Sequence, residues 1–188
     1  MSEPVSALNR ATFEGPFVSI KELGPVGMVT IRGDFASAAF AKAVEKVCGA
    51  PVPGQRRFEQ GLGWMSPDEL IWCGAYEGAP DIVAGIGEAL AGEHHLAANV
   101  SDARAVFRLR GHGARELIAK GAPVDMAPSA FGPGDFRRTH LGQVAAAFWM
   151  DQEGPDEFRL VCFRSLGGYV FDWLSASAAS GATPGYLR

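Results

Sequence analysis

The sequence has few cysteines, no long apolar run and no excess of basic residues. Its three cysteines, Cys48, Cys73 and Cys162, are odd in number and widely spaced, which argues against a disulfide framework and indicates small buried residues in a reducing compartment. No apolar segment approaches the roughly 20 residues that a membrane-spanning helix needs. The first ten residues lack the basic and apolar stretches of a signal peptide. We therefore expect a cytoplasmic protein with no membrane contact.

The charge balance argues against nucleic-acid binding. The 188 residues include 17 Lys and Arg against 21 Asp and Glu, a net charge of −4. Proteins that bind nucleic acid usually present a basic face that displaces counterions from phosphates. A local cluster of Arg104, Arg108 and Arg110 is present, but the chain as a whole lacks that balance. Hydrophobic residues make up 47%, which is ordinary for a globular protein.

The sequence contains a weak internal repeat. Each copy opens with a β-rich run ending in Arg-Gly, continues with a helical pattern ending in Gly-Ala-Pro-Val, and later reaches Pro-Asp-Glu, an apolar run and a second helical pattern. These features lie at 28–34, 49–52 and 67–69 in the first copy, and at 105–111, 121–124 and 155–157 in the second. The spacings differ between copies, so the pattern indicates a duplicated unit and not a solenoid array.

Apolar residues at helical spacing predict four helices. The helical segments are 36–48, the residues after Pro80-Asp81, 113–120, and the residues after Ser165. Gly49 is suited to end the first helix, because glycine enters the left-handed region at little cost. We expect the Ser165 side chain to cap the start of the last helix.

Short β-rich runs predict antiparallel hairpins. The paired runs are 144–150 with 158–164, and 61–66 with 70–74, the latter joined across Pro67-Asp68-Glu69. In 104–110, the apolar residues at 105, 107 and 109 alternate with three arginines and Val106, which predicts a half-buried strand with a basic outer face.

Together these segments predict an α+β fold of two related lobes, each with the order strand, helix, strand, strand, helix and an antiparallel sheet. We place a loosely structured lead-in at 1–24, the first lobe at 25–96, the second lobe at 97–178 and a C-terminal tail at 179–188. We expect the lobes to form one compact domain overall.

Two acidic pairs, Asp68-Glu69 and Asp156-Glu157, are candidates for general acid and base catalysis. Each follows a proline between two strands, where acidic side chains are normal solvated turn residues. Catalytic pairs need burial and unequal environments to separate their pKa values. We therefore interpret both pairs as turn residues.

The histidines and serines support no catalytic or metal site. His94 and His95 are adjacent, so their side chains diverge on a helix or a strand, and no metal-binding spacing occurs around them. His112 and His140 are isolated. Ser165 lacks the first glycine of a Gly-x-Ser-x-Gly elbow, and Ser66 fits a turn equally well.

One stretch, Arg110-Gly111-His112-Gly113, follows a strand and opens a helix as a phosphate-binding loop would. However, Glu116 stands at the third glycine position of Gly-x-Gly-x-x-Gly, where its carboxylate would repel pyrophosphate. We interpret this stretch as a plain strand-to-helix turn. The sequence thus leads us to assign no catalytic, cofactor-binding or metal-ligating residue.

Four Trp and twelve Phe leave room for an apolar surface patch that a partner covers.

Three runs resemble the gamma subunit of heterotetrameric sarcosine oxidase. They are NVSDARAVFRLRGHGARELIAKGAPVDMAPSAFGPGDFRRTHLGQVAAAFW (99–149), DEFRLVCFRSLGGYVFDWL (156–174) and MSPDELIWCG (65–74). The combination of Val-Ser-Asp-x-Arg, Arg-Gly-x-Gly-Ala-Arg and Ala-Lys-Gly-x-Pro-x-Asp is fairly specific. The similarity spans about residues 60 to 175. His112 stands where relatives often have Pro and Ala122 where they often have Cys, and neither departure affects chemistry that we can identify.

The resemblance implies a fold like the folate-binding domain of glycine-cleavage aminomethyltransferases. It also implies an assembly with alpha, beta and delta chains, which would carry FAD, FMN, NAD, tetrahydrofolate and zinc. The family's complex oxidises sarcosine to glycine and hydrogen peroxide and passes a one-carbon unit to tetrahydrofolate. No catalytic or cofactor residue of the gamma chain can be transferred here, so the resemblance implies a non-catalytic structural subunit.

Two alternatives remain open. A free-standing folate-binding protein of the aminomethyltransferase superfamily would share the fold, but the Lys-Gly-Cys-Tyr-x-Gly-Gln signature of one such branch is replaced by Lys120-Gly121-Ala122-Pro123. A stand-alone enzyme with an unrecognised site has the least support.

Overall fold

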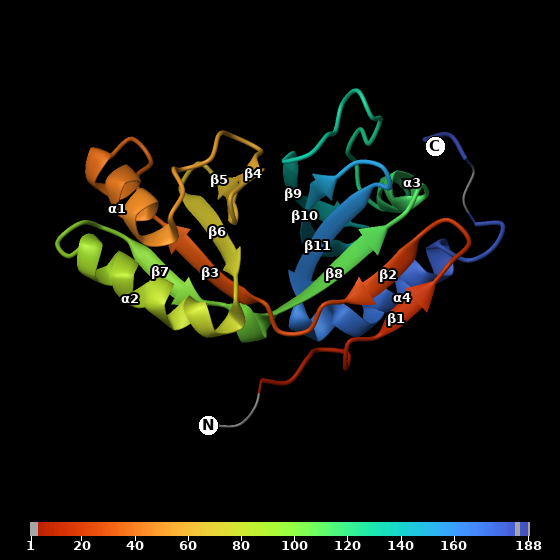
Figure 1. Ribbon diagram of the computed structural model, residues 1–188, viewed down its shortest axis with the longest axis horizontal. Coiled ribbons are helices and arrows are strands. Elements are labelled where there is room, and N and C mark those ends of the chain that lie inside the picture. Colours follow the sequence, from red (N-terminus) through yellow and green to blue (C-terminus); the bar gives the residue numbers. More distant parts are fainter. Residues whose placement is uncertain (1–3, 183–184, 188) are drawn as a thin grey trace. The chain divides into compact units, whose positions relative to one another are not determined.

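The computed structural model describes residues 4–182 and 185–187, and Figure 1 shows the arrangement of its helices and strands. Contacts divide the chain into two units: unit 1 comprises Met1–Pro25 and Ala103–Arg188, and unit 2 comprises Val26–Asp102. This division differs from the boundary that we placed between residues 96 and 97. The reason is that the strand after residue 95 pairs with the sheet of unit 2.

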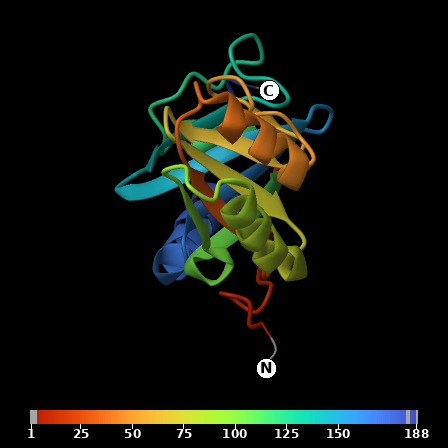
Figure 2. The same ribbon diagram turned by 90° about the vertical axis from the view of Figure 1, so that its left-hand side faces the viewer.

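Unit 2 is a five-stranded antiparallel sheet with two helices. The strands lie in the order β4 (Phe58–Glu59), β5 (Leu62–Ser66), β6 (Glu69–Gly74), β3 (Gly27–Arg32) and β7 (Leu96–Asn99). The helices are α1 (Ala38–Cys48) and α2 (Ala79–Ala89), the latter preceded by the 3₁₀ turn η1 (Tyr76–Gly78). Figure 2 shows both helices in front of this sheet. Their apolar residues pack on β3, β5 and β6 in one core.

The ends of α1 follow from its sequence. The Ser37 hydroxyl accepts a hydrogen bond from the Phe40 N–H at 3.3 Å, which satisfies one of the free donors of the first turn. Gly49 ends the helix with φ of 74°, and its N–H donates to the Glu45 carbonyl. The predicted end of this helix is therefore confirmed.

Unit 1 is a six-stranded antiparallel sheet. The strands lie in the order β1 (Thr12–Glu14), β2 (Ser19–Glu22), β8 (Arg104–Arg110), β11 (Glu157–Phe163), β10 (Val144–Gln152) and β9 (Phe136–Leu141). Its helices are α3 (Ala114–Ala119) and α4 (Gly167–Ser177). The 3₁₀ turn η2 (Ser101–Ala103) leads into β8, and the 3₁₀ turn η3 (Arg164–Leu166) leads into α4. Both predicted hairpins, β5–β6 and β10–β11, are present.

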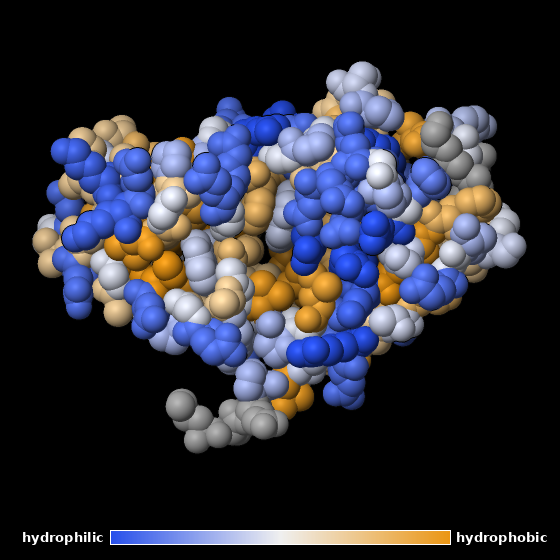
Figure 3. Space-filling view, in the orientation of Figure 1, coloured by the Kyte–Doolittle hydropathy of each residue, from blue (hydrophilic) through white to orange (hydrophobic). Residues whose placement is uncertain are grey.

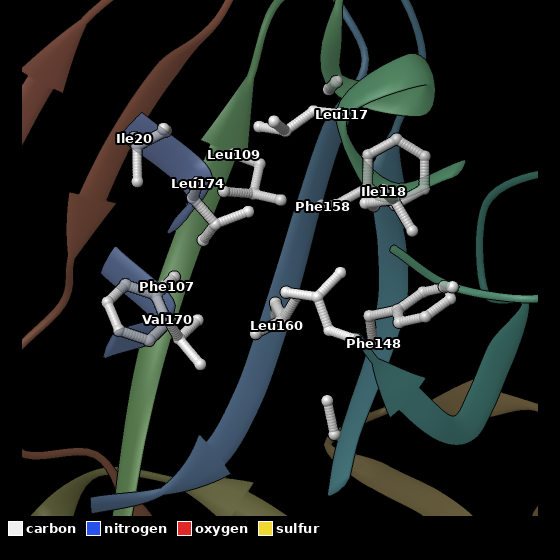
Figure 4. Packing of buried hydrophobic residues seen from close by; sticks show 14 of the residues in the cluster. Ile20, Phe107, Leu109, Leu117, Ile118, Phe148, Phe158, Leu160, Val170 and Leu174 are labelled. Carbon is white, nitrogen blue, oxygen red and sulfur yellow. The ribbon is translucent and has the colours of Figure 1, made fainter. Parts of the chain in front are cut away.

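The core of unit 1 lies between its sheet and the helices α3 and α4. Figure 4 shows Val170 and Leu174 of α4 beside Phe107 and Leu109 of β8, and all four side chains are fully buried. Leu117 and Ile118 of α3 belong to the same cluster. Burying a side chain of this size stabilises the fold by roughly 1.5–3 kcal/mol before the conformational entropy is subtracted.

The start of α4 differs from our expectation. No side chain caps it, and Leu166 occupies the N-cap position where we expected Ser165. The 3₁₀ turn η3 runs directly into the helix, and the Gly167 N–H donates to the Arg164 carbonyl. Because the turn supplies this backbone partner, the Ser165 hydroxyl is not needed there.

The segment before residue 25 is part of the unit 1 sheet, and the expectation of a loose lead-in is wrong for the described residues. Strand β2 pairs with β8 along its whole length. Val18 and Ile20 are 2% and 0% exposed and belong to the core of unit 1. A strand of four residues with neighbouring Pro and Gly carries little periodic signal, so its position depends on pairing with a strand some 90 residues later.

The two copies of the repeat exchange their first strands. Strand β2 directly precedes β3 in the first copy, and β7 directly precedes β8 in the second. Strand β7 starts 77 residues after β2, at 96 against 19, and β8 starts 77 residues after β3, at 104 against 27. Yet β2 pairs with β8 of the second copy, and β7 pairs with β3 of the first copy. Each sheet is therefore completed by a strand from the other copy, a feature that no local pattern in the sequence indicates.

Candidate functional site

The Pro-Asp-Glu turn has the same structural role in both units. The N–H of the glycine that ends the Arg-Gly run donates to the aspartate carbonyl, from Gly33 to Asp68 at 3.1 Å and from Gly111 to Asp156 at 2.9 Å. Each aspartate carboxylate also lies 2.6 Å from an arginine, Arg32 for Asp68 and Arg115 for Asp156. The repeated motif therefore fastens a hairpin turn to the end of the first strand.

The two ion pairs differ in burial. Arg32 and Asp68 are about half exposed, whereas the Arg115 side chain is 2% exposed and that of Asp156 is 18%. A hydrogen bond from the Ser66 hydroxyl, followed by the Arg32 guanidinium, lowers the pKa of Asp68 below its ordinary value. Asp68 is a turn residue as predicted. For Asp156 the expectation of a solvated carboxylate is wrong, because it partners a buried arginine.

Arg115 is the polar centre of unit 1. Its Nε donates to the Asp156 carboxylate, and one terminal nitrogen donates to the carbonyls of Met126 and Phe131 at 3.1 and 2.6 Å. The other terminal nitrogen contacts Met150 Sδ at 3.4 Å and lies 3.9 Å from the Glu153 carboxylate. All three nitrogens therefore face partners within unit 1, as a buried guanidinium requires.

The sequence reasoning missed this role of Arg115. A signal existed: Arg115 and Glu116 are the charged residues in a six-residue helix whose other members are apolar. Short helices surrounded by apolar segments bury most of their surface, so a charge there needs a partner from elsewhere in the fold.

The other buried polar side chains also bind the chain's own backbone. Glu22 accepts from the Ser6 hydroxyl and from the N–H groups of Arg10 and Gly24. Glu116 accepts from the N–H groups of Gly185 and Leu187, both at 2.8 Å. Both carboxylates therefore fix terminal segments to unit 1, including part of the C-terminal tail at 179–188.

Ser101 has the same kind of role in unit 2. Its hydroxyl accepts from the Met28 N–H at 2.9 Å and contacts Asn99 Oδ1 at 2.6 Å. With Glu22, Arg115 and Glu116 it completes the set of buried polar residues within the described part of the chain. All four serve the packing of the fold.

The glycine-rich stretch after β8 is a strand-to-helix turn. Gly111 has φ of 136°, and a Cβ there would lie 2.3 Å from the Phe17 carbonyl oxygen. The Gly113 N–H donates to the same carbonyl at 3.0 Å. These glycines therefore let the segment before β2 approach closely, and the N–H that a phosphate could use is already bonded.

His94 and His95 lie together in unit 2, whereas His112 and His140 lie at separate places in unit 1. His94 and His95 follow α2 and line a pocket of about 810 Å³ in unit 2, together with Arg32, Asp34, Asp68 and neighbouring residues. His112 lines a pocket of about 250 Å³ in unit 1 near Arg115 and Glu153. His140 lies on β9. Among residues 4–182 and 185–187, no three His, Cys, Asp or Glu side chains form a group that could hold a metal ion.

All three cysteines carry thiol side chains, and none forms a disulfide. Burial raises the pKa of Cys48 and of Cys162 to about 11, because the thiolate loses hydration inside the protein. Both thiols are therefore protonated near neutral pH and make weak nucleophiles.

None of the helices in the described part of the chain has the length and apolar character needed to span a membrane.

Sequence comparison places these features in a family. The model of the sarcosine oxidase gamma subunit family matches residues 32–180. The chain belongs to that family. The resemblance noted in the sequence is thereby confirmed.

Two curated gamma subunits are similar to the chain. Sarcosine oxidase subunit gamma of Corynebacterium sp. (strain P-1) is 28% identical over 163 residues, which cover 84% of this chain and 78% of that protein. The subunit gamma of Arthrobacter sp. is 30% identical over 137 residues, which cover 68% of this chain and 63% of that protein. The chain thus matches less than two thirds of the length of the Arthrobacter protein.

Two solved structures share the fold. A chain of the heterotetrameric sarcosine oxidase from Corynebacterium sp. U-96, in complex with pyrrole 2-carboxylate, matches with a TM-score of 0.78 at 20% identity and covers 92% of this chain and 89% of its own. The glycine cleavage system aminomethyltransferase T from Bartonella henselae matches with a TM-score of 0.59 at 10% identity over 84% of this chain and 45% of its own. The predicted α+β fold with antiparallel sheets, like that of an aminomethyltransferase, is confirmed.

Proposed function

We propose that this gamma-family chain is a non-catalytic structural subunit of a cytoplasmic heterotetrameric sarcosine oxidase. Its partners are the alpha, beta and delta subunits, which carry FAD, FMN, NAD, tetrahydrofolate and zinc. The complex demethylates sarcosine oxidatively: sarcosine, oxygen and tetrahydrofolate give glycine, hydrogen peroxide and the methylene form of tetrahydrofolate. This chain contributes assembly and no reacting group.

The observation that carries the proposal is the use of the buried polar groups. In an active site, some ionisable side chains are buried and aimed at the reacting atoms. Here the buried side chains of Glu22, Ser101, Arg115 and Glu116 all have partners from their own unit. Arg115, the only buried cation among the described residues, has no nitrogen left to orient a substrate. Membership of the gamma subunit family supports the same role.

A direct test is coexpression with the alpha, beta and delta chains and purification through a tag on alpha. We expect this chain in one-to-one ratio with alpha, and sarcosine-dependent oxygen consumption by the complex. The chain purified alone should show no such consumption. A monomer that fails to associate with tagged alpha would refute the structural role.

A free-standing folate-binding protein is the second candidate, because aminomethyltransferase T shares the fold over 84% of this chain. Calorimetry of the isolated chain with tetrahydrofolate separates the two. Micromolar binding would favour the folate-binding protein, whereas the structural role predicts no measurable heat of binding.

A further inference from the structure

Three cations stand in a row across neighbouring strands of unit 1. Lys21 of β2 lies directly opposite Arg108 of β8, and Arg108 lies directly opposite Arg159 of β11. Side chains directly opposite each other in antiparallel strands point to the same face, with Cβ atoms about 5 Å apart. We call Lys21, Arg108 and Arg159 the cationic row. All three side chains are partly exposed, and Figure 3 shows hydrophilic side chains gathered over β8 and β11.

Acidic neighbours within the chain neutralise one end of the row. Arg159 lies 2.6 Å from the Asp151 carboxylate and 3.7 Å from that of Glu157. Arg108 and Lys21 have no ion pair or side-chain hydrogen bond to any residue in 4–182 or 185–187. Like charges directly opposite in a sheet are destabilising, so Lys21 and Arg108 repel each other in the isolated chain.

Unit 2 shows that the fold does not require this row. In the repeat, Arg32 and Glu69 are paired as Arg110 and Glu157 are. Thr30 lies two residues before Arg32 on β3, just as Arg108 lies two residues before Arg110 on β8, so Thr30 is the counterpart of Arg108. Thr30 lies opposite Ile71 of β6 and Ala98 of β7. The equivalent row in unit 2 carries no charge. The repulsion in unit 1 is thus a property of this surface and not of the architecture.

The surface around the row is also basic, against the net charge of −4 of the whole chain. Arg104 and Arg110 lie at the two ends of β8, on the same face as Arg108 because side chains alternate along a strand. Arg110 lies 3.6 Å from Glu157, and Arg104 lies over the Phe163 ring at 4.1 Å. Three strands spaced at about 4.8 Å make the row roughly 10 Å wide, which is wider than a single phosphate or carboxylate.

We propose that the cationic row is the surface on which this chain binds an acidic segment of a partner subunit, with carboxylates of that segment placed between Lys21, Arg108 and Arg159. The inference rests on the proposed function, since it names the docking surface of the structural subunit. Partner carboxylates would replace the repulsion within the row by attraction, and they would also speed association. An acidic protein segment fits better than a small anion, because it supplies several carboxylates across the full width.

The test compares three variants in the coexpressed complex: Arg108→Thr, which copies the residue of unit 2, Arg108→Glu, and Lys42→Glu as a matched charge change on the exposed side of α1. Arg108→Thr should weaken association with the partner subunits by roughly tenfold, and Arg108→Glu by more. It should also reduce the dependence of affinity on salt. Lys42→Glu should bind as the original chain does.

A stability measurement distinguishes weak binding from misfolding. Removing the repulsion should leave the thermal midpoint of isolated Arg108→Thr unchanged or higher, while its binding falls. If the original chain assembles and Arg108→Thr assembles equally well, the row is not the docking surface although the structural role stands. Failure of the original chain to assemble would end the proposed function itself. Inorganic phosphate that binds the isolated chain but not Arg108→Thr, with assembly unaffected, would assign the row to a small anion and overturn the inference.

Discussion

At the scale of single residues, buried charges in this protein bind the backbone of distant segments. Arg115 joins α3 to the carbonyls of Met126 and Phe131 and to the turn at Asp156. Glu116, the next residue, holds the N–H groups of Gly185 and Leu187. One short helix thereby fixes three segments without a long apolar surface of its own.

Replacing Arg115 by Met should destabilise the protein strongly. Asp156 would keep its charge with no counterion, and the Met126 and Phe131 carbonyls would lose their donor, so the free energy of unfolding should fall by about 3–5 kcal/mol. Urea unfolding followed by circular dichroism measures the change. The half-exposed pair of the first repeat is the control: Arg32→Met should have a much smaller effect. Equal losses would mean that burial does not set the strength of these pairs.

At the scale of elements, helix α2 contains two glycines with different surroundings. A Cβ at Gly85 would lie 2.8 Å from Val47 Cγ1 of α1, whereas a Cβ at Gly87 would meet nothing within 4 Å. Valine is stiff about χ1 and yields little space. Gly85 therefore permits close packing of α1 on α2, while Gly87 only weakens the helix.

Gly87→Ala should stabilise the protein by about 0.5–1 kcal/mol, because alanine has the higher helix propensity and restricts the unfolded chain. Gly85→Ala gains the same propensity but must displace Val47, so its gain should be cancelled or reversed. Thermal unfolding of the two variants side by side gives the comparison. A similar rise in both midpoints would show that α1 and α2 do not pack closely at Gly85.

At the scale of the whole molecule, strand exchange makes the two units unequal. Unit 2 is one continuous segment that holds all five strands of its sheet. Unit 1 is made of two segments, and its central strand β8 depends on β2 from before residue 25. Without β2, one edge of β8 is unpaired and the core loses Val18 and Ile20.

A fragment of residues 103–188 should therefore not fold by itself, and it should fold when mixed with a peptide of residues 1–25. Dispersion of amide signals in NMR spectra reports the folding, and titration of the peptide gives its affinity. A peptide with Ile20→Lys is the control and should not bind, because it places a charge at a position that is 0% exposed. Independent folding of 103–188 would contradict the dependence on β2.

Local patterns predicted the elements that carry a strong local signal. Helix α1 has both its cap residues and its apolar face in the sequence, and the hairpins β5–β6 and β10–β11 are each joined by a short turn. Strands β1, β2, β4, β7 and β9 were missed. They are short or weakly alternating, and β7, for example, has no fully buried residue, so their pairing depends on contacts far along the chain.

The candidate site followed the same division. A metal-ligand spacing, a nucleophile elbow and a phosphate-loop motif are defined by residue types and intervals, so the sequence alone could be searched for them. The burial of Arg115 could not be found in this way, because its partners Phe131, Met150 and Asp156 come from three other parts of the chain.

By itself the sequence determined the family, the duplicated α+β order and the end of α1 at Gly49, since all three rest on residues that are near one another in the chain. Only the tertiary structure decided which strands complete each sheet, where Arg115 and Glu116 find their partners and that Lys21, Arg108 and Arg159 stand in one row. Those features depend on contacts between segments about 10 to 90 residues apart, and strand register across the longer distances is set by the packing of the whole sheet. The basic face of the strand at 104–110 could therefore be predicted from the sequence. The cationic row could not, because it joins three strands that are far apart in the chain.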